Sequence, residues 1–296
     1  MPKIIIFGTV IVLILTAIFF NARREIPKTP SSKIRVAASF YIPAEFARQI
    51  GGEKVDVISI TPSGVEPHEY EPTPGEIADV YSTKLFIYQG GVFDAWAGRL
   101  RDDLVTRGVK VVSVMDSFGL KNADPHIWLD PDLARREAEI IRGALIEIDP
   151  VNAFLYQKNS VDYLNVISLL DEEYKKGLAQ CAKKDFVVSH SAFGRLAGRY
   201  GLFPHSIVGA SSEEEPSPGR IAEIIKLARA KGIKHIFTEP LVSSRAVETI
   251  ARETGAEILT LNPIEGLTEK DAADGKNYIS LMRENLQNLR QALSCE

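Results

Sequence analysis

The chain has 296 residues, of which 45% are hydrophobic and 25% charged, with a formal net charge of −4. This length is sufficient for two globular domains, and the slightly acidic balance argues against nucleic acid as the main partner. No block of like charges indicates a binding tail, and the three glutamates at 213–215 are typical of a solvated loop.

An apolar run, Ile4–Phe20, lies near the start of the chain and is followed by Arg23 and Arg24. Its length is intermediate between a signal-peptide core and a full membrane span. No clean cleavage site follows, and no cysteine stands near its end for lipid attachment. We therefore expect an extracytoplasmic protein, in the periplasm or at the cell surface. Residues 1–32 would form its signal or anchor segment and tether. We expect an uncleaved anchor that contacts the membrane, and a cleaved signal is the alternative.

Short β-type runs alternate with helical patterns after this segment. The expected strands are 33–40, the run from Val55, 84–90 and 109–114. The expected helices include 42–51 and one with a capping box, in which Thr73 is the N-cap, Pro74 the first residue and Glu76 the third. Alternation of this kind predicts a parallel sheet with helices on both faces, in a first lobe of residues 33–148.

The pattern becomes helical from Pro131 to about residue 180. One helix is expected at 131–148. A second, within 149–181, begins at an Asp-Pro boundary and extends for nearly thirty residues. Such a helix would be roughly 40 Å long at 1.5 Å per residue, which is long for one compact domain. We predict that it is a rigid connection between two lobes.

The strand–helix alternation resumes in residues 182–296. Strands are expected at 185–190, 203–209, 233–239 and 256–263, with helices starting at Ala192, Pro218 and Ser243. The sequence thus predicts an α/β fold with two parallel-sheet lobes joined by one long helix. In such folds, ligands bind at the carboxyl ends of the strands and in the cleft between lobes.

Two cysteines, Cys181 and Cys295, remain to be explained. In an oxidising compartment an even pair predicts a disulfide, here closing a loop of roughly a hundred residues. The alternative is two unrelated thiols.

Three histidines fall where the expected fold would place a site. His68 lies in the loop after the second strand, His126 in the loop before the two long helices, and His190 at the end of a strand of the second lobe. Pro67 and Pro125 each precede a histidine and restrict the backbone that directs the ring. Imidazole suits zinc, and three such ligands with a fourth donor would complete a tetrahedral site.

Most of the chain beyond the N-terminal segment resembles the metal-specific solute-binding proteins of zinc and manganese ABC importers. The resemblance rests on collinear stretches, among them FYIPAEFARQIGGEKVDVISITPSGVEPHEYEPTPGEIADV, DPHIWLDP, IDPVNAFLYQKN, VVSHSAFGRLAGRYGL, EEEPSPGRIAEI and IFTEPLVSSRAVETIARETGAEIL. It implies two α/β lobes, a long rigid helix and a divalent cation between the lobes. It also implies a monomer that delivers its metal to an ABC permease.

By this resemblance His68, His126 and His190 match the first three metal ligands of the family. A histidine at the third position resembles the zinc-type members, whereas the manganese-type members have a carboxylate there. The fourth position lies in a strand-end turn that is LDP-like in the family and reads LNP here, which makes Asn262 the candidate ligand. Water, Glu239 and Glu265 are the alternatives. The expected cargo is Zn²⁺, with Mn²⁺ possible.

Three other functions compete with a zinc receptor. The chain could be a manganese or iron receptor of the same family, or a zinc-dependent hydrolase that activates water on a three-histidine site. Because no HExxH motif is present, and Glu66 and Glu69 are expected to be loop residues and not bases, we expect no enzyme. The third possibility is a cell-adhesion protein with a structural metal.

Overall fold

The computed structural model describes residues 33–120, 123–210 and 214–296. Lys33–Glu296 forms one compact unit, and the expected anchor segment at 1–32 lies outside the described residues. Across the described part of the chain, no helix has the length and hydrophobicity needed to cross a membrane.

The first sheet has four parallel strands in the order β2-β1-β3-β4. Its strands are β1 (Ile34–Ala38), β2 (Val55–Ser59), β3 (Leu85–Tyr88) and β4 (Lys110–Ser113). Successive side chains of β3 enter opposite cores: Leu85 and Ile87 pack on one face, Phe86 and Tyr88 on the other. Both faces are therefore buried, which explains why the strand is apolar throughout.

Helices cover both faces of this sheet, as the alternation predicted. Helices α2 (Tyr41–Gly51) and α6 (Pro131–Ile148) pack on one face, and α3 (Pro74–Tyr81) and α4 (Ala95–Thr106) on the other. The short elements are η1 (Gly52–Lys54), α5 (Val114–Ser117) and η2 (Ile127–Leu129). The predicted capping box is confirmed, because Thr73 Oγ1 accepts the Glu76 amide at 3.3 Å and the Thr73 amide donates to the Glu76 carboxylate at 2.7 Å.

The second sheet repeats this plan with the parallel order β6-β5-β7-β8. Its strands are β5 (Asp185–Val188), β6 (Phe203–Ser206), β7 (His235–Thr238) and β8 (Glu257–Thr260). Helices α9 (Pro218–Lys231) and α10 (Arg245–Thr254) pack on the face where Val187 points. Helices α8 (Gly194–Tyr200) and α12 (Tyr278–Leu293) pack on the opposite face, and α11 (Glu269–Ala273) precedes α12.

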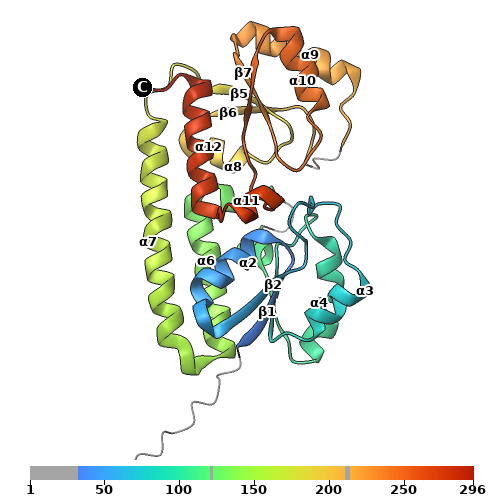
Figure 1. The fold of residues 1–296 in the computed structure, drawn as a ribbon, viewed down its shortest axis with the longest axis vertical. Helices are drawn as coiled ribbons and strands as arrows, with labels where there is room; N and C mark the ends of the chain where they lie inside the picture. The colour runs from blue at the N-terminus through green and yellow to red at the C-terminus, as the bar shows by residue number, and fades with distance from the viewer. Residues whose placement is uncertain (1–32, 121–122, 211–213) are drawn as a thin grey trace, which may run out of the picture. The chain divides into compact units, whose positions relative to one another are not determined.

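The long connecting helix is confirmed as α7 (Ala153–Gly177), 25 residues that follow η3 (Pro150–Asn152). It lies beside α6 and α12 (Figure 1), and the Tyr174 hydroxyl donates to the Met282 carbonyl at 2.6 Å. One hydrophobic core contains side chains from both sheets and from α7, including Val36 and Phe237. This shared core does not mark where one lobe ends and the next begins. The lobe limits at residues 148 and 182 therefore stay a prediction.

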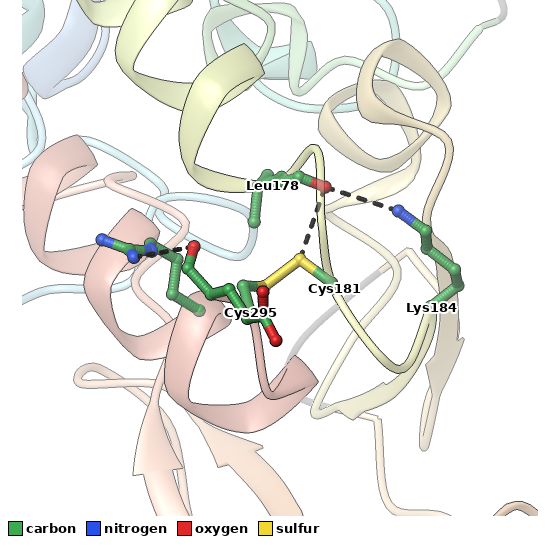
Figure 2. Close-up of a disulfide and its surroundings, with 6 residues drawn as sticks. Leu178, Cys181, Lys184 and Cys295 are labelled. Atoms are coloured by element: carbon green, nitrogen blue, oxygen red, sulfur yellow. Dashed lines mark hydrogen bonds between the residues drawn. A yellow bond between two sulfur atoms is a disulfide. The ribbon is translucent and has the colours of Figure 1, made fainter.

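A disulfide joins Cys181 to Cys295, 114 residues apart in the sequence (Figure 2). It ties the segment after α7 to the end of α12, where the Ala182 amide donates to the Ser294 carbonyl at 3.2 Å and the Glu296 amide to the Gln180 carbonyl at 3.1 Å. The disulfide expected from the two cysteines is thus confirmed.

Breaking this disulfide should destabilise the protein markedly. A loop of this size is expected to contribute about 4–5 kcal/mol in the chain-entropy model, because the cross-link restricts the unfolded chain. Denaturant unfolding of the oxidised protein, the reduced protein and the double variant Cys181→Ser/Cys295→Ser measures this. The reduced protein and the variant should match, and adding reductant to the variant should change nothing. Equal midpoints for all three would contradict the prediction.

Glu137 of α6 is fully buried in the shared core, and both of its carboxyl oxygens lack a hydrogen-bond partner among the described residues. The Ser160 and Tyr163 hydroxyls of α7 are also buried, and neither has a hydrogen-bond partner within residues 33–120, 123–210 and 214–296. Burial disfavours the carboxylate and raises the pKa of Glu137 to about 8. Glu137 is therefore expected to be protonated in the folded protein at neutral pH.

Replacing Glu137 with glutamine should remove a pH dependence of stability. Since the folded pKa of about 8 lies above that of an unfolded glutamate, the stability that protonated Glu137 contributes is fully present only below the unfolded pKa of about 4 and is lost as the pH rises toward 8. Between these limits the wild type should lose up to about 1.4 kcal/mol per pH unit relative to Glu137→Gln, with no further loss above pH 8. Unfolding free energies at pH 5, 6, 7 and 8.5 measure the difference. A constant gap would show that Glu137 is ionised in the fold.

Candidate metal centre

Four side chains converge from loops at the carboxyl ends of strands in both sheets. His68 follows β2 and His126 immediately precedes η2, whereas His190 follows β5 and Glu265 follows β8. One ligand atom from each of the four lies within 4.8 Å of every other. The three predicted histidines are therefore brought together, although 122 positions separate the first from the last by number (190 − 68).

The spacing of these donor atoms suits tetrahedral coordination. Glu265 Oε1 lies 3.1 Å from His68 Nε2, 2.9 Å from His126 Nε2 and 3.3 Å from His190 Nε2. His126 Nε2 is 3.4 Å from the Nε2 atoms of both His68 and His190. A tetrahedron with zinc–ligand distances of about 2.0–2.1 Å has edges of about 3.3 Å. Five of the six donor–donor distances are thus close to the edges of a zinc tetrahedron.

The centre is buried and contains one carboxylate. His126 and His190 are fully buried, and Glu265 is 2% exposed. Burial alone would raise the pKa of Glu265, but hydrogen bonds from His126, His190 and His68 hold it well below its usual range. Such a carboxylate, surrounded by imidazole nitrogens, provides a buried anionic position that a cation can neutralise.

Two of the rings are each oriented by a further carboxylate on the Nδ1 side. Asp124 Oδ1 lies 2.7 Å from His126 Nδ1, and Glu239 Oε2 lies 2.6 Å from His190 Nδ1. Burial lowers the pKa of both histidines, but these carboxylates and Glu265 outweigh it, and the pKa of His190 rises to about 10. The Nδ1 proton of each ring faces its carboxylate, so that loss of the Nε2 proton would leave the Nε2 lone pair directed toward the centre.

Carboxylates also hold the backbone of each of the three histidines. The sequence carries the pattern acid-Pro-His twice, at 66–68 and 124–126. In each, the acid accepts the histidine amide at 3.0 Å, from His68 to Glu66 Oε2 and from His126 to Asp124 Oδ1. The His190 amide donates to Glu239 Oε1 at 3.1 Å. This repeated pattern was the signal in the sequence that could have identified Asp124.

Asn262, the predicted fourth ligand, has a different place in the structure. Its Oδ1 accepts the Ile264 amide at 2.8 Å within the turn after β8, whereas the carboxylate of Glu265 stands among the three histidines. Glu239, the other acid considered, contacts the Nδ1 side of His190. The geometry favours Glu265 as the fourth donor, because the Asn262 oxygen is already used by its own turn; the ligand set itself stays a prediction.

Comparison with known proteins agrees with this geometry. The family described as "Zinc-uptake complex component A periplasmic" matches residues 36–292. This chain belongs to that family. The family is defined by a component of an uptake system and not by an enzyme, in agreement with the absence of a catalytic motif from the sequence.

Individual relatives are similar over most of this chain. The high-affinity zinc uptake system protein ZnuA of Bacillus subtilis is 33% identical over 280 residues, which cover 88% of each chain. The Zn(II)-bound crystal structure of AdcA from Streptococcus pneumoniae is 34% identical, with a TM-score of 0.80, over 90% of this chain but only 59% of AdcA. The laminin-binding protein Lmb of Streptococcus agalactiae, described as having adhesin and metal-transporting activity, is 33% identical with a TM-score of 0.81 and covers 88% and 100% of the two chains.

Removing the charge that orients His190 should weaken zinc binding without removing a donor. We expect Glu239→Gln to lower zinc affinity about 10–100-fold, the usual effect of losing an outer carboxylate. Competition with a chromophoric chelator measures it. Asp185→Asn is the matched control, because Asp185 Oδ1 makes a similar 2.9 Å contact with His205 Nε2 outside the centre. Equal affinities for the two variants would contradict the role given to Glu239.

Proposed function

We propose that this protein captures Zn²⁺ with His68, His126, His190 and Glu265 and delivers it to the permease of an ABC importer outside the cytoplasm. The observation that supports this most directly is the group of three imidazole Nε2 atoms around one buried Glu265 oxygen, at 2.9–3.3 Å. The zinc-uptake family gives the transport context. Attachment through residues 1–32 and a monomeric state are parts of the same proposal.

The donor set favours zinc over manganese. Three imidazole nitrogens and one carboxylate provide four donors, mostly nitrogen, at tetrahedral spacing. Zn²⁺ accepts four such ligands readily, whereas Mn²⁺ prefers more oxygen donors in octahedral geometry. His190 occupies the position where manganese-type relatives were expected to carry a carboxylate. Manganese or iron could then bind only weakly, with a poorly matched coordination sphere.

The same geometry argues against hydrolysis. A catalytic zinc keeps one position for water, typically beside three protein ligands. Here the fourth corner is provided by Glu265, which is 2% exposed and hydrogen-bonded to all three imidazole rings. A closed set of four donors is suited to holding an ion and not to activating water. Cargo release would then require at least one donor to move.

A competitive titration of the metal-free protein with zinc and manganese tests the proposal. We expect one zinc per chain, bound at least about 100-fold more tightly than manganese because of the nitrogen-rich tetrahedral set. His190→Ala and Glu265→Gln should each lower zinc affinity by about 100-fold or more, since the first removes a donor and the second exchanges an anionic donor for a weaker neutral one.

His205→Ala is the matched control, because His205 is a partly buried histidine of β6 paired with Asp185 and lies outside the centre. It should bind zinc as the wild type does. Zinc binding that persists in His190→Ala, or a preference for manganese, would refute the assignment.

A further inference from the structure

The turn that carries Glu265 is built around the side chain of Asn262. Asn262 is 7% exposed, and its Oδ1 accepts the Ile264 amide at 2.8 Å, which closes an Asx-type turn after β8. Glu265, whose carboxylate lies among the three histidines, is the next residue after the amide that Asn262 holds. The side chain of Asn262 therefore acts on the backbone immediately before the donor.

Ile264 has an unfavourable backbone conformation. Its φ is 60°, and its side chain is fully buried. Among the described residues with a side chain, only Ser294 shares a positive φ, at a helix end. A β-branched residue rarely adopts this left-handed region, because its Cβ is crowded by the backbone, and such a conformation persists only where the surroundings enforce it. The turn thus needs external contacts to hold its shape.

These contacts come from both sides of the turn. On one side Asn285 of α12 accepts the Asn262 amide at 2.8 Å and donates to its carbonyl at 2.7 Å. On the other side the indole of Trp128, two residues after His126, donates to the Pro263 carbonyl at 2.7 Å. The turn that presents Glu265 is thereby linked to the loop that presents His126.

We propose that Asn262 is a positioning residue, which holds the strained 262–265 turn in the conformation that brings Glu265 Oε1 to the three imidazoles. Without the Asn262 oxygen, the buried Ile264 amide loses its partner and the backbone of Ile264 relaxes toward the extended region. The carboxylate of Glu265 then withdraws from the centre. The turn is also the element whose relaxation would release the ion. This inference rests on the proposed zinc site.

Zinc affinity and dissociation rate in a set of variants of the full chain test the inference. Asn262→Ala should weaken zinc binding at least ten-fold and speed dissociation by a similar factor. Asn262→Asp keeps an oxygen that can accept the Ile264 amide, and it should restore most of the affinity lost in Asn262→Ala. Asn159→Ala is the matched control: it removes a side-chain bond of 3.0 Å to the Ile50 carbonyl, at the amino-end side of the first sheet.

A glycine at 264 separates positioning from general stability. Glycine adopts a positive φ without crowding, so Asn262→Ala should cost less than three-fold in zinc affinity in the Ile264→Gly background. A loss of ten-fold or more in that background would overturn the inference, as would wild-type affinity in Asn262→Ala alone. Tighter zinc binding by Asn262→Asp than by the wild type would instead make residue 262 a direct ligand.

The failure of the proposed function has a separate signature. If the wild type does not bind zinc, or if Glu265→Gln binds it unchanged, the metal centre is wrong and this inference falls with it. If the wild type binds zinc and Glu265→Gln does not, a result for Asn262→Ala equal to the wild type refutes the role of Asn262 alone.

Discussion

The metal centre depends on carboxylates that hold histidine backbones. The amides of His68, His126 and His190 each donate to a carboxylate, from Glu66, Asp124 and Glu239 in that order. Loops at strand ends are otherwise free to vary, and a donor displaced by 1 Å no longer fits a tetrahedral ion. These bonds fix the backbone position of each histidine. For His126 and His190 the same carboxylate also contacts Nδ1 and so keeps the proton on that nitrogen.

Burying the Glu265 carboxylate before an ion binds has an electrostatic cost. A bound cation would remove that cost. Glu265 is buried as an anion, stabilised by hydrogen bonds to three imidazoles. A divalent cation replaces those hydrogen bonds with coordination bonds and neutralises the charge.

The shared core limits how such a site can open. Side chains from both sheets pack into one hydrophobic core with α6, α7 and α12, and the Cys181–Cys295 disulfide fastens the segment after α7 to the end of α12. A wide hinge motion would expose this core to water, at a cost of about 25 cal/mol per Å² of apolar surface. Local movement of a loop that carries a donor is less costly, and the 262–265 turn is the loop with a strained residue beside its donor.

The sequence alone determined the architecture and three of the four side chains that converge in the structure. Alternating apolar runs predicted the two parallel sheets, the Thr73 capping box predicted the start of α3, and the pattern after Asp149 predicted the long helix. These features depend on periodicity and local hydrogen bonding, which neighbouring residues specify. The final helices α11 and α12 were missed, although the apolar spacing within 278–293 is helical.

Only the tertiary structure decided which side chain stands fourth among the three histidines. Asn262 and Glu265 are three positions apart in one turn, and sequence spacing does not tell which side chain faces the histidines. That choice follows from contacts with distant residues, because Asn285 and Trp128 hold the turn and the positive φ of Ile264 redirects the chain before Glu265. A side chain's direction in an irregular turn depends on backbone angles set by packing, and these angles become known only when the partners of the turn are in place.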